Sequence, residues 1–144
     1  MAINTASAAI SFARKLEEDG AKLYEVLSQR YPKGKDIFLT FAKENQKNVV
    51  QIERAYYGVI TDAIEGCFAF NMNPDKYMVK TELSEGAGLS EALDKAITSE
   101  KKTIEFYSDA AEQSKSLMAD VPRAFTLVAR KREGREEKLR ALLT

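Results

Sequence analysis

Histidine is absent from this chain of 144 residues, and cysteine occurs once, as Cys67. Without histidine the chain cannot build a Ser/His or Cys/His nucleophile pair or a metal site that needs imidazole ligands. A single cysteine allows neither an internal disulfide nor a cysteine-rich metal site, and we expect Cys67 to be a small buried residue. A Gly-rich phosphate loop is also missing. We therefore predict no catalytic residues and no organic cofactor.

An excess of charge of one sign is missing too. Lys plus Arg equal Asp plus Glu at 22 each, so the chain creates no overall field that would attract nucleic acid or an anionic membrane. The N-terminus has no basic region before an apolar stretch, and no apolar run reaches membrane-spanning length. We expect a soluble, cytoplasmic protein that binds neither nucleic acid nor a membrane.

The chain does contain the material for a core, since 44% of its residues are hydrophobic and its length suits one domain, residues 1–144. Apolar residues recur at spacings of three and four, which predicts helices over about 5–29, 36–62, 90–114 and 122–142. The short turn at 31–34 predicts an antiparallel hairpin, and the long stretch from 66 to 88 predicts a crossover. The expected fold is an all-α four-helix bundle of two hairpins.

Polar residues stand at the middle of all four apolar stripes. Glutamates occupy the first and third stripes, asparagines the second and arginines the fourth: Glu17, Glu100, Asn45, Asn48, Arg132 and Arg135. An isolated buried charge costs several kcal/mol or more. Polar groups that point inward from four helices must therefore pair with one another, which predicts a polar centre in the bundle.

The first helices of the two predicted hairpins share a short pattern that indicates internal duplication. An alanine is followed by a glutamate and then by a tyrosine at the same spacing, as Ala13, Glu17 and Tyr24 and again as Ala96, Glu100 and Tyr107. A tyrosine on a buried stripe usually packs its ring and bonds its hydroxyl to a polar neighbour. We expect that neighbour to be a buried carboxylate.

This order of hairpin, crossover and hairpin, with the Ala-x-x-x-Glu and Tyr pattern, resembles the ferritin-like superfamily and most of all its rubrerythrin-type domain, over about residues 8–142. In that family a Glu from the first helix of each hairpin and a Glu-x-x-His pair from each second helix hold two iron atoms. Glu17 and Glu100 match the lone glutamates. The Glu-x-x-His positions are degenerate and hold Asn45, Asn48, Arg132 and Arg135.

This departure predicts an ion-pair network in place of iron. Arginine carries a permanent positive charge and no lone pair, so it repels a metal ion. Two glutamates opposite two arginines form a neutral set, and the guanidinium fork fits a carboxylate through two hydrogen bonds. We therefore expect no metal at these positions and no cofactor.

A rival helix register would use neighbouring carboxylates. A rotation of about 100° would bring Glu44, Glu133 and Glu136 inward beside Glu17 and Glu100, and could form an all-oxygen metal site. The rotation would expose large apolar side chains, including Phe41, Ile52, Val128 and Leu139, at a cost of roughly 1.5–3 kcal/mol each. The sequence therefore favours the first register.

Three functions stay open at this point. The first is a non-catalytic, structural or partner-binding ferritin-like protein. The second is a di-iron oxidoreductase or iron-handling protein of the rubrerythrin type, acting on peroxide, oxygen or ferrous iron. It would need an external electron donor, because the four-cysteine rubredoxin-like module is absent. The third is a binder of a small polar ligand in the bundle core.

The apolar segment 67–72 is expected to cover the bundle end or to form a homodimer contact.

Overall fold

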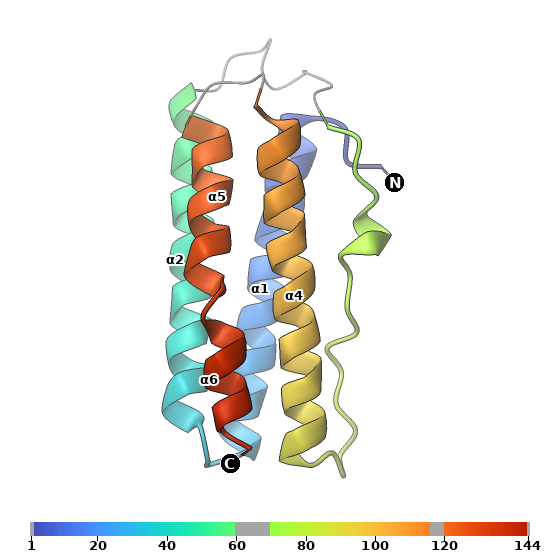
Figure 1. Cartoon of the computed structure of the whole chain (residues 1–144), viewed down its shortest axis with the longest axis vertical. Coiled ribbons are helices and arrows are strands. Elements are labelled where there is room, and N and C mark those ends of the chain that lie inside the picture. The colour runs from blue at the N-terminus through green and yellow to red at the C-terminus, as the bar shows by residue number, and fades with distance from the viewer. Residues whose placement is uncertain (1, 60–69, 116–119, 144) are drawn as a thin grey trace.

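Four helical rods lie side by side along the long axis of the molecule (Figure 1). This computed structural model describes residues 2–59, 70–115 and 120–143. The rods are α1 (Ala6–Arg30), α2 (Lys35–Val59), α4 (Leu89–Gln113) and the consecutive pair α5 (Asp120–Arg132) and α6 (Arg135–Ala141), and a short 3-10 helix, η1 (Pro74–Lys76), lies outside them. The described residues contain no β-strand, so the prediction of an all-α protein is confirmed.

The rods form two antiparallel hairpins joined by a long connection (Figure 1). The turn between α1 and α2 contains Gly34, whose φ of 92° favours glycine and which packs against Leu142. Residues 70–88 then run along the length of the bundle beside α4, so that α4 points in the same direction as α2 (Figure 1). Contacts join α1 to α2, α2 to α5, α5 to α4 and α4 to α1, which places antiparallel neighbours around the bundle.

The prediction of one continuous fourth helix over 122–142 is wrong. It begins earlier, at Asp120, and is divided at Glu133 and Gly134 into α5 and α6. The amide of Glu133 donates to the carbonyl oxygen of Arg130 at 3.3 Å, a bond that spans only three residues. Glycine inside a helix is less stable than alanine by about 0.5–1 kcal/mol, so Gly134 offers a place to end one helix and start another.

The other helices begin and end within a few residues of the predicted positions. The predicted end of the second helix, residues 60–62, lies outside the described residues, as do Cys67, Phe68 and Ala69 of the apolar crossover segment. None of the described helices is long and apolar enough to cross a membrane.

The crossover is held to the bundle by hydrogen bonds at both ends. Ile3 and Met72 exchange backbone hydrogen bonds of 2.7 and 3.0 Å, and the Tyr31 hydroxyl donates to the carbonyl oxygen of Ala87 at 2.6 Å. Phe70 and Met72 are 3% and 2% exposed and pack into the core. This described part of the apolar segment therefore covers the bundle within one chain.

The buried apolar side chains of the described residues form two clusters. One is formed by the first half of α1, the second halves of α2 and α4, and α5, and includes Phe12, Ile52, Phe106 and Phe125. The other is formed by the opposite halves of these helices with α6, and includes Leu27, Phe38, Leu93 and Leu139. Between the two clusters the bundle is filled by polar side chains.

Candidate functional site

A buried polar layer crosses the bundle between the two apolar clusters. It contains all six inward polar positions predicted from the sequence, each at most 2% exposed: Glu17, Asn45, Asn48, Glu100, Arg132 and Arg135. They come from α1, α2, α4 and the junction of α5 and α6. The helical period of each stripe thus brings residues that are up to 118 positions apart into one contiguous group.

Arg132, the last residue of α5, joins the two buried glutamates. Its Nη2 donates to both carboxylate oxygens of Glu17 at 2.7 Å, and its Nε lies 3.1 Å from Glu17 Oε2. Its Nη1 donates to Glu100 Oε2 at 2.7 Å. One guanidinium therefore links carboxylates from α1 and α4, in the charge-assisted geometry that gives strong hydrogen bonds.

Arg135, the first residue of α6, completes the charge balance. Its Nη1 donates to Glu100 Oε1 at 2.9 Å and to Asn45 Oδ1 at 2.7 Å. The guanidinium carbon lies 4.6 Å from the centre of the Phe41 ring, where the aromatic face attracts a cation. Its Nε has no hydrogen-bond partner among the described residues, and its Nη2 is 3.6 Å from the half-exposed Glu44.

The tyrosines of the repeated pattern bond across the two hairpins. The Tyr24 hydroxyl of α1 donates to Glu100 Oε1 of α4 at 2.6 Å, and the Tyr107 hydroxyl of α4 donates to Glu17 Oε2 of α1 at 2.8 Å. Asn48 Nδ2 adds a bond of 3.1 Å to Glu17 Oε1. The predicted bonds between tyrosine and carboxylate are confirmed, and each one joins residues of different repeats.

The environment of the layer favours an ionised Glu100 and neutral tyrosines. Burial opposes ionisation of Glu100, but Arg132 and Arg135 outweigh it and lower the pKa of that carboxyl. Burial also opposes the charge of Arg132, yet Glu100 and Glu17 raise its pKa. The pKa values of Tyr24 and Tyr107 are raised well above 10.0, first by burial and then by the neighbouring carboxylates. At neutral pH both hydroxyls therefore act as hydrogen-bond donors.

The side chains of this layer do not fit a pair of iron ions. The carboxylates of Glu17 and Glu100 are bound by guanidinium nitrogens, and an arginine supplies no lone pair for a metal. Among the residues that the structure describes, no group of three or more Asp, Glu, Cys or His side chains could hold a metal ion. The arrangement is instead a neutral set of buried ion pairs.

The rival register is not the one that the structure adopts. Glu133 is exposed, and the side chains of Glu44 and Glu136 are 45% and 35% exposed. Phe41 and Ile52, which a rotation would expose, are 2% exposed each. The carboxylates of this second set therefore lie at the surface, where they make at most loose contacts with the buried layer.

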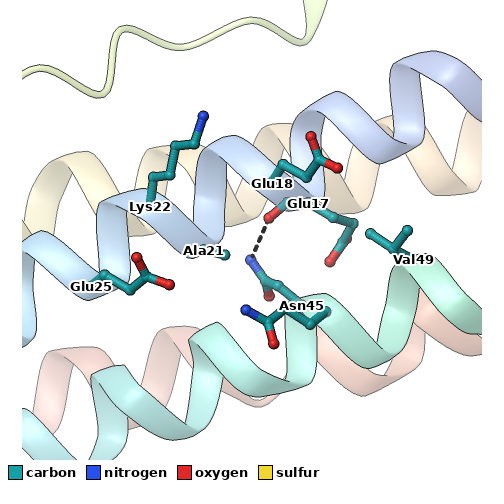
Figure 2. A pocket seen from close by; sticks show the side chains of 8 residues that line it. Glu17, Glu18, Ala21, Lys22, Glu25, Asn45 and Val49 are labelled. Atoms are coloured by element: carbon teal, nitrogen blue, oxygen red, sulfur yellow. Dashed lines mark hydrogen bonds between the residues drawn. The ribbon is translucent and has the colours of Figure 1, made fainter.

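A cleft between α1 and α2 reaches the edge of the layer (Figure 2). Its volume is about 330 Å³, and it is lined by Glu17, Glu18, Ala21, Lys22, Glu25, Asn45, Gln46 and Val49. Figure 2 shows Asn45 reaching across from α2, where its Nδ2 donates to the backbone oxygen of Glu17 at 3.2 Å. The floor of the cleft is formed where the two helices approach each other closely.

Gly20 makes this approach possible, and sequence reasoning missed its role. A Cβ atom at Gly20 would lie 2.8 Å from Asn45 Nδ2, closer than such atoms can pack. Asn45 cannot move away freely, because its amide is held by Glu17 on one side and by Arg135 on the other. The signal in the sequence was a glycine at a buried position in the middle of a helical stripe.

Replacing Gly20 by alanine is expected to destabilise the protein by about 1–2 kcal/mol, because the overpacking at Asn45 outweighs the gain in helix propensity. The measurement is urea-induced unfolding followed by circular dichroism. Gly58→Ala in α2 is the matched control, since outside the adjoining backbone of α2 no atom of the described residues lies within 4 Å of the added methyl group, and it should leave stability equal or higher. Equal effects of the two changes would contradict the close approach at Asn45.

The candidate site is therefore a closed network of two acids, two arginines and two amides, with a shallow cleft at one edge. Its polar groups come from every rod of the bundle, and its members are bonded chiefly to one another. Comparison of the chain with family models, with curated proteins and with solved structures finds no match in any of the three.

Proposed function

We propose that this chain is a ferritin-like domain, similar to the rubrerythrin type, in which an ion-pair network replaces the di-iron site and whose role is structural or partner-binding. The topology supports the proposal, because two antiparallel hairpins are joined by a crossover that leaves α2 and α4 parallel (Figure 1). The placement of the polar residues supports it as well. A lone glutamate comes from the first helix of each hairpin, and a pair spaced by three comes from each second helix or its continuation.

The observation that carries the proposal is the position of Arg132. Its guanidinium lies between Glu17 and Glu100 and bonds to both at 2.7 Å while it is only 2% exposed. In the family that the sequence resembles, the glutamates at the two matching positions bind iron. Here a side chain of the protein supplies the positive charge that they need, so the bundle is complete without a metal ion.

This arrangement argues against redox chemistry at the layer. A metal ion would have to displace two guanidinium groups from carboxylates that hold them through several hydrogen bonds. Displacement would also leave two buried arginines without counter-ions, which costs several kcal/mol. The oxidoreductase function would require this exchange before any reaction with peroxide or oxygen, so the structural or partner-binding role is the one that the geometry favours.

The native protein is expected to bind ferrous iron far below one ion per chain. The test is metal analysis of protein purified from iron-supplemented cells, followed by anaerobic titration with ferrous iron and calorimetric detection. A parallel titration at high salt separates loose binding to surface carboxylates, which salt screens, from binding in the buried layer. Stoichiometric, salt-resistant iron would overturn the proposal and favour the di-iron oxidoreductase or iron-handling function.

A further inference from the structure

Basic side chains gather on the outer face of α2 and α5, although the chain as a whole is neutral. The exposed basic residues at the seam of α2 and α5 include Lys47, Arg54, Arg123 and Lys131, and the exposed acid Asp120 lies among them. Among the described residues none of them forms a salt bridge, and Lys131 bonds instead to the amide oxygen of Gln51 at 2.6 Å. Exposed cations on other faces are mixed in this respect. Lys15 pairs with Asp19 and Arg140 with Glu136, whereas Lys22 and Lys35 form no salt bridge with another described residue.

Apolar side chains lie among these cations. Val50 is 48% exposed and Leu127 is 39% exposed. Scattered apolar side chains at a surface are ordinary, but a group of them within a recessed surface is typical of a binding site.

Two adjoining hollows form this recess, which we call the α2–α5 trough. The first has a volume of about 450 Å³ and is lined by Lys47, Val50, Gln51 and Arg54. The second has a volume of about 320 Å³ and is lined by Gln51, Arg54, Ala55, Asp120, Arg123, Ala124 and Leu127. Gln51 and Arg54 belong to both, so the trough continues from α2 onto the seam with α5.

We propose that the α2–α5 trough docks an acidic amphipathic helix of a partner protein. The apolar side chains of such a helix would cover Val50 and Leu127, and its carboxylates would pair with Arg54 and Arg123. Charge complementarity of this kind supplies specificity and association rate, and an apolar centre within a charged rim is the usual anatomy of a protein interface. This inference rests on the partner-binding role proposed above and names the partner's chemistry.

Other occupants fit the trough less well. A second copy related by two-fold symmetry through this face would oppose cations to cations, because such an interface uses the same patch on both chains. A membrane is entered by apolar side chains that project outward, whereas the apolar residues here line hollows. A nucleic acid backbone needs the cations but not the apolar floor.

The test uses a synthetic helical peptide of about 20 residues with leucines at helical spacing flanked by glutamates, and a scrambled peptide of the same composition. Binding is measured by fluorescence anisotropy at physiological salt, and the contact surface is mapped by amide chemical shifts. We expect the native chain to bind the helical peptide, with the largest shifts around Val50, Arg54 and Leu127. The scrambled peptide should bind at least tenfold more weakly.

Charge reversal at the trough should weaken this binding strongly. The variant Lys47→Glu/Arg54→Glu/Arg123→Glu is expected to weaken the affinity at least tenfold. The control Lys22→Glu/Lys35→Glu/Lys80→Glu changes the net charge equally at exposed positions elsewhere and should change the affinity less than threefold. Circular dichroism is used to check that both variants are folded.

Several results would overturn the trough as a helix-docking site. They are failure of the native chain to bind the helical peptide, equal weakening by the two charge variants, and tighter binding to a DNA duplex or to anionic lipid vesicles than to the peptide. The ferrous titration of the native chain reports on the buried layer and not on this face. Failure of the trough is therefore distinguishable from failure of the proposed replacement of iron.

Discussion

Arg132→Ala is expected to destabilise the protein by about 3–5 kcal/mol, because removing one partner of a buried ion pair leaves uncompensated charge in the interior. The loss should lie near the upper end of this range, since Arg132 neutralises two carboxylates. Glu17 would lose its guanidinium partner, and Glu100 would keep only Arg135. The free energy of unfolding is measured by urea titration at pH 7, with circular dichroism at 222 nm as the readout.

A neighbouring arginine provides the matched control. Arg130 lies on the same helix, is exposed and makes no salt bridge among the described residues, so Arg130→Ala should leave the free energy of unfolding nearly unchanged. Arg132→Lys should recover part of the loss, because an ammonium keeps the charge but cannot bond to both carboxylates in the fork geometry. Equal stability of the Arg132→Ala and Arg130→Ala proteins would show that the buried ion pairs do not form in solution.

The helical period of the sequence was enough to identify the polar layer. In a helix, residues three and four apart share a face, so the apolar neighbours of Asn45 and Asn48 determined which way those amides point. The same reasoning placed Arg132 and Arg135 inward, and their burial follows from Val128 and Leu139 on the same stripe. Residue type then predicted the ion pairs, because buried charges must be compensated.

The individual partners within the layer could not be predicted from the sequence. Which carboxylate accepts from Tyr24, and whether one arginine or two bridge the acids, depend on the relative height and rotation of the four rods. Those quantities are set by packing between helices, which sequence period does not report. The exchange of tyrosine bonds between α1 and α4 is a result of this packing.

Features that involve the backbone were missed for the same reason. In the sequence, Gly134 is a single glycine within an amphipathic pattern. Many helices tolerate such a residue, so the pattern predicts one continuous helix. The structure nevertheless divides the fourth rod at Glu133 and Gly134 into α5 and α6. The pairing of Ile3 with Met72 joins two segments without helical period, between which the sequence offers no pattern to predict a contact.

Restoring the ligand pattern of the ferritin-like family should convert the layer into a metal site. The variant carries four changes, Asn45→Glu, Asn48→His, Arg132→Glu and Arg135→His, at positions that are all buried and all face Glu17 or Glu100. Replacing Asn45 and Arg132 by carboxylates and Arg135 by a neutral imidazole changes the layer from neutral to a charge of minus four, which two ferrous ions would balance. We expect binding of about two ferrous ions per chain, measured by anaerobic titration.

The same variant should be unstable without metal, and this dependence makes the test decisive. Four buried carboxylates repel one another and raise the free energy of the metal-free fold, whereas a metal ion that binds the native state stabilises it by mass action. The melting temperature should therefore fall in chelator and rise with added ferrous iron. The control Asn45→Glu/Asn48→His keeps both arginines. It should bind no iron, because the guanidinium groups still bond to Glu17 and Glu100 and repel a metal ion. If the fourfold variant is folded but gains no iron, these side chains do not converge in solution as they do in the structure, and the resemblance to di-iron bundles would not extend to the layer.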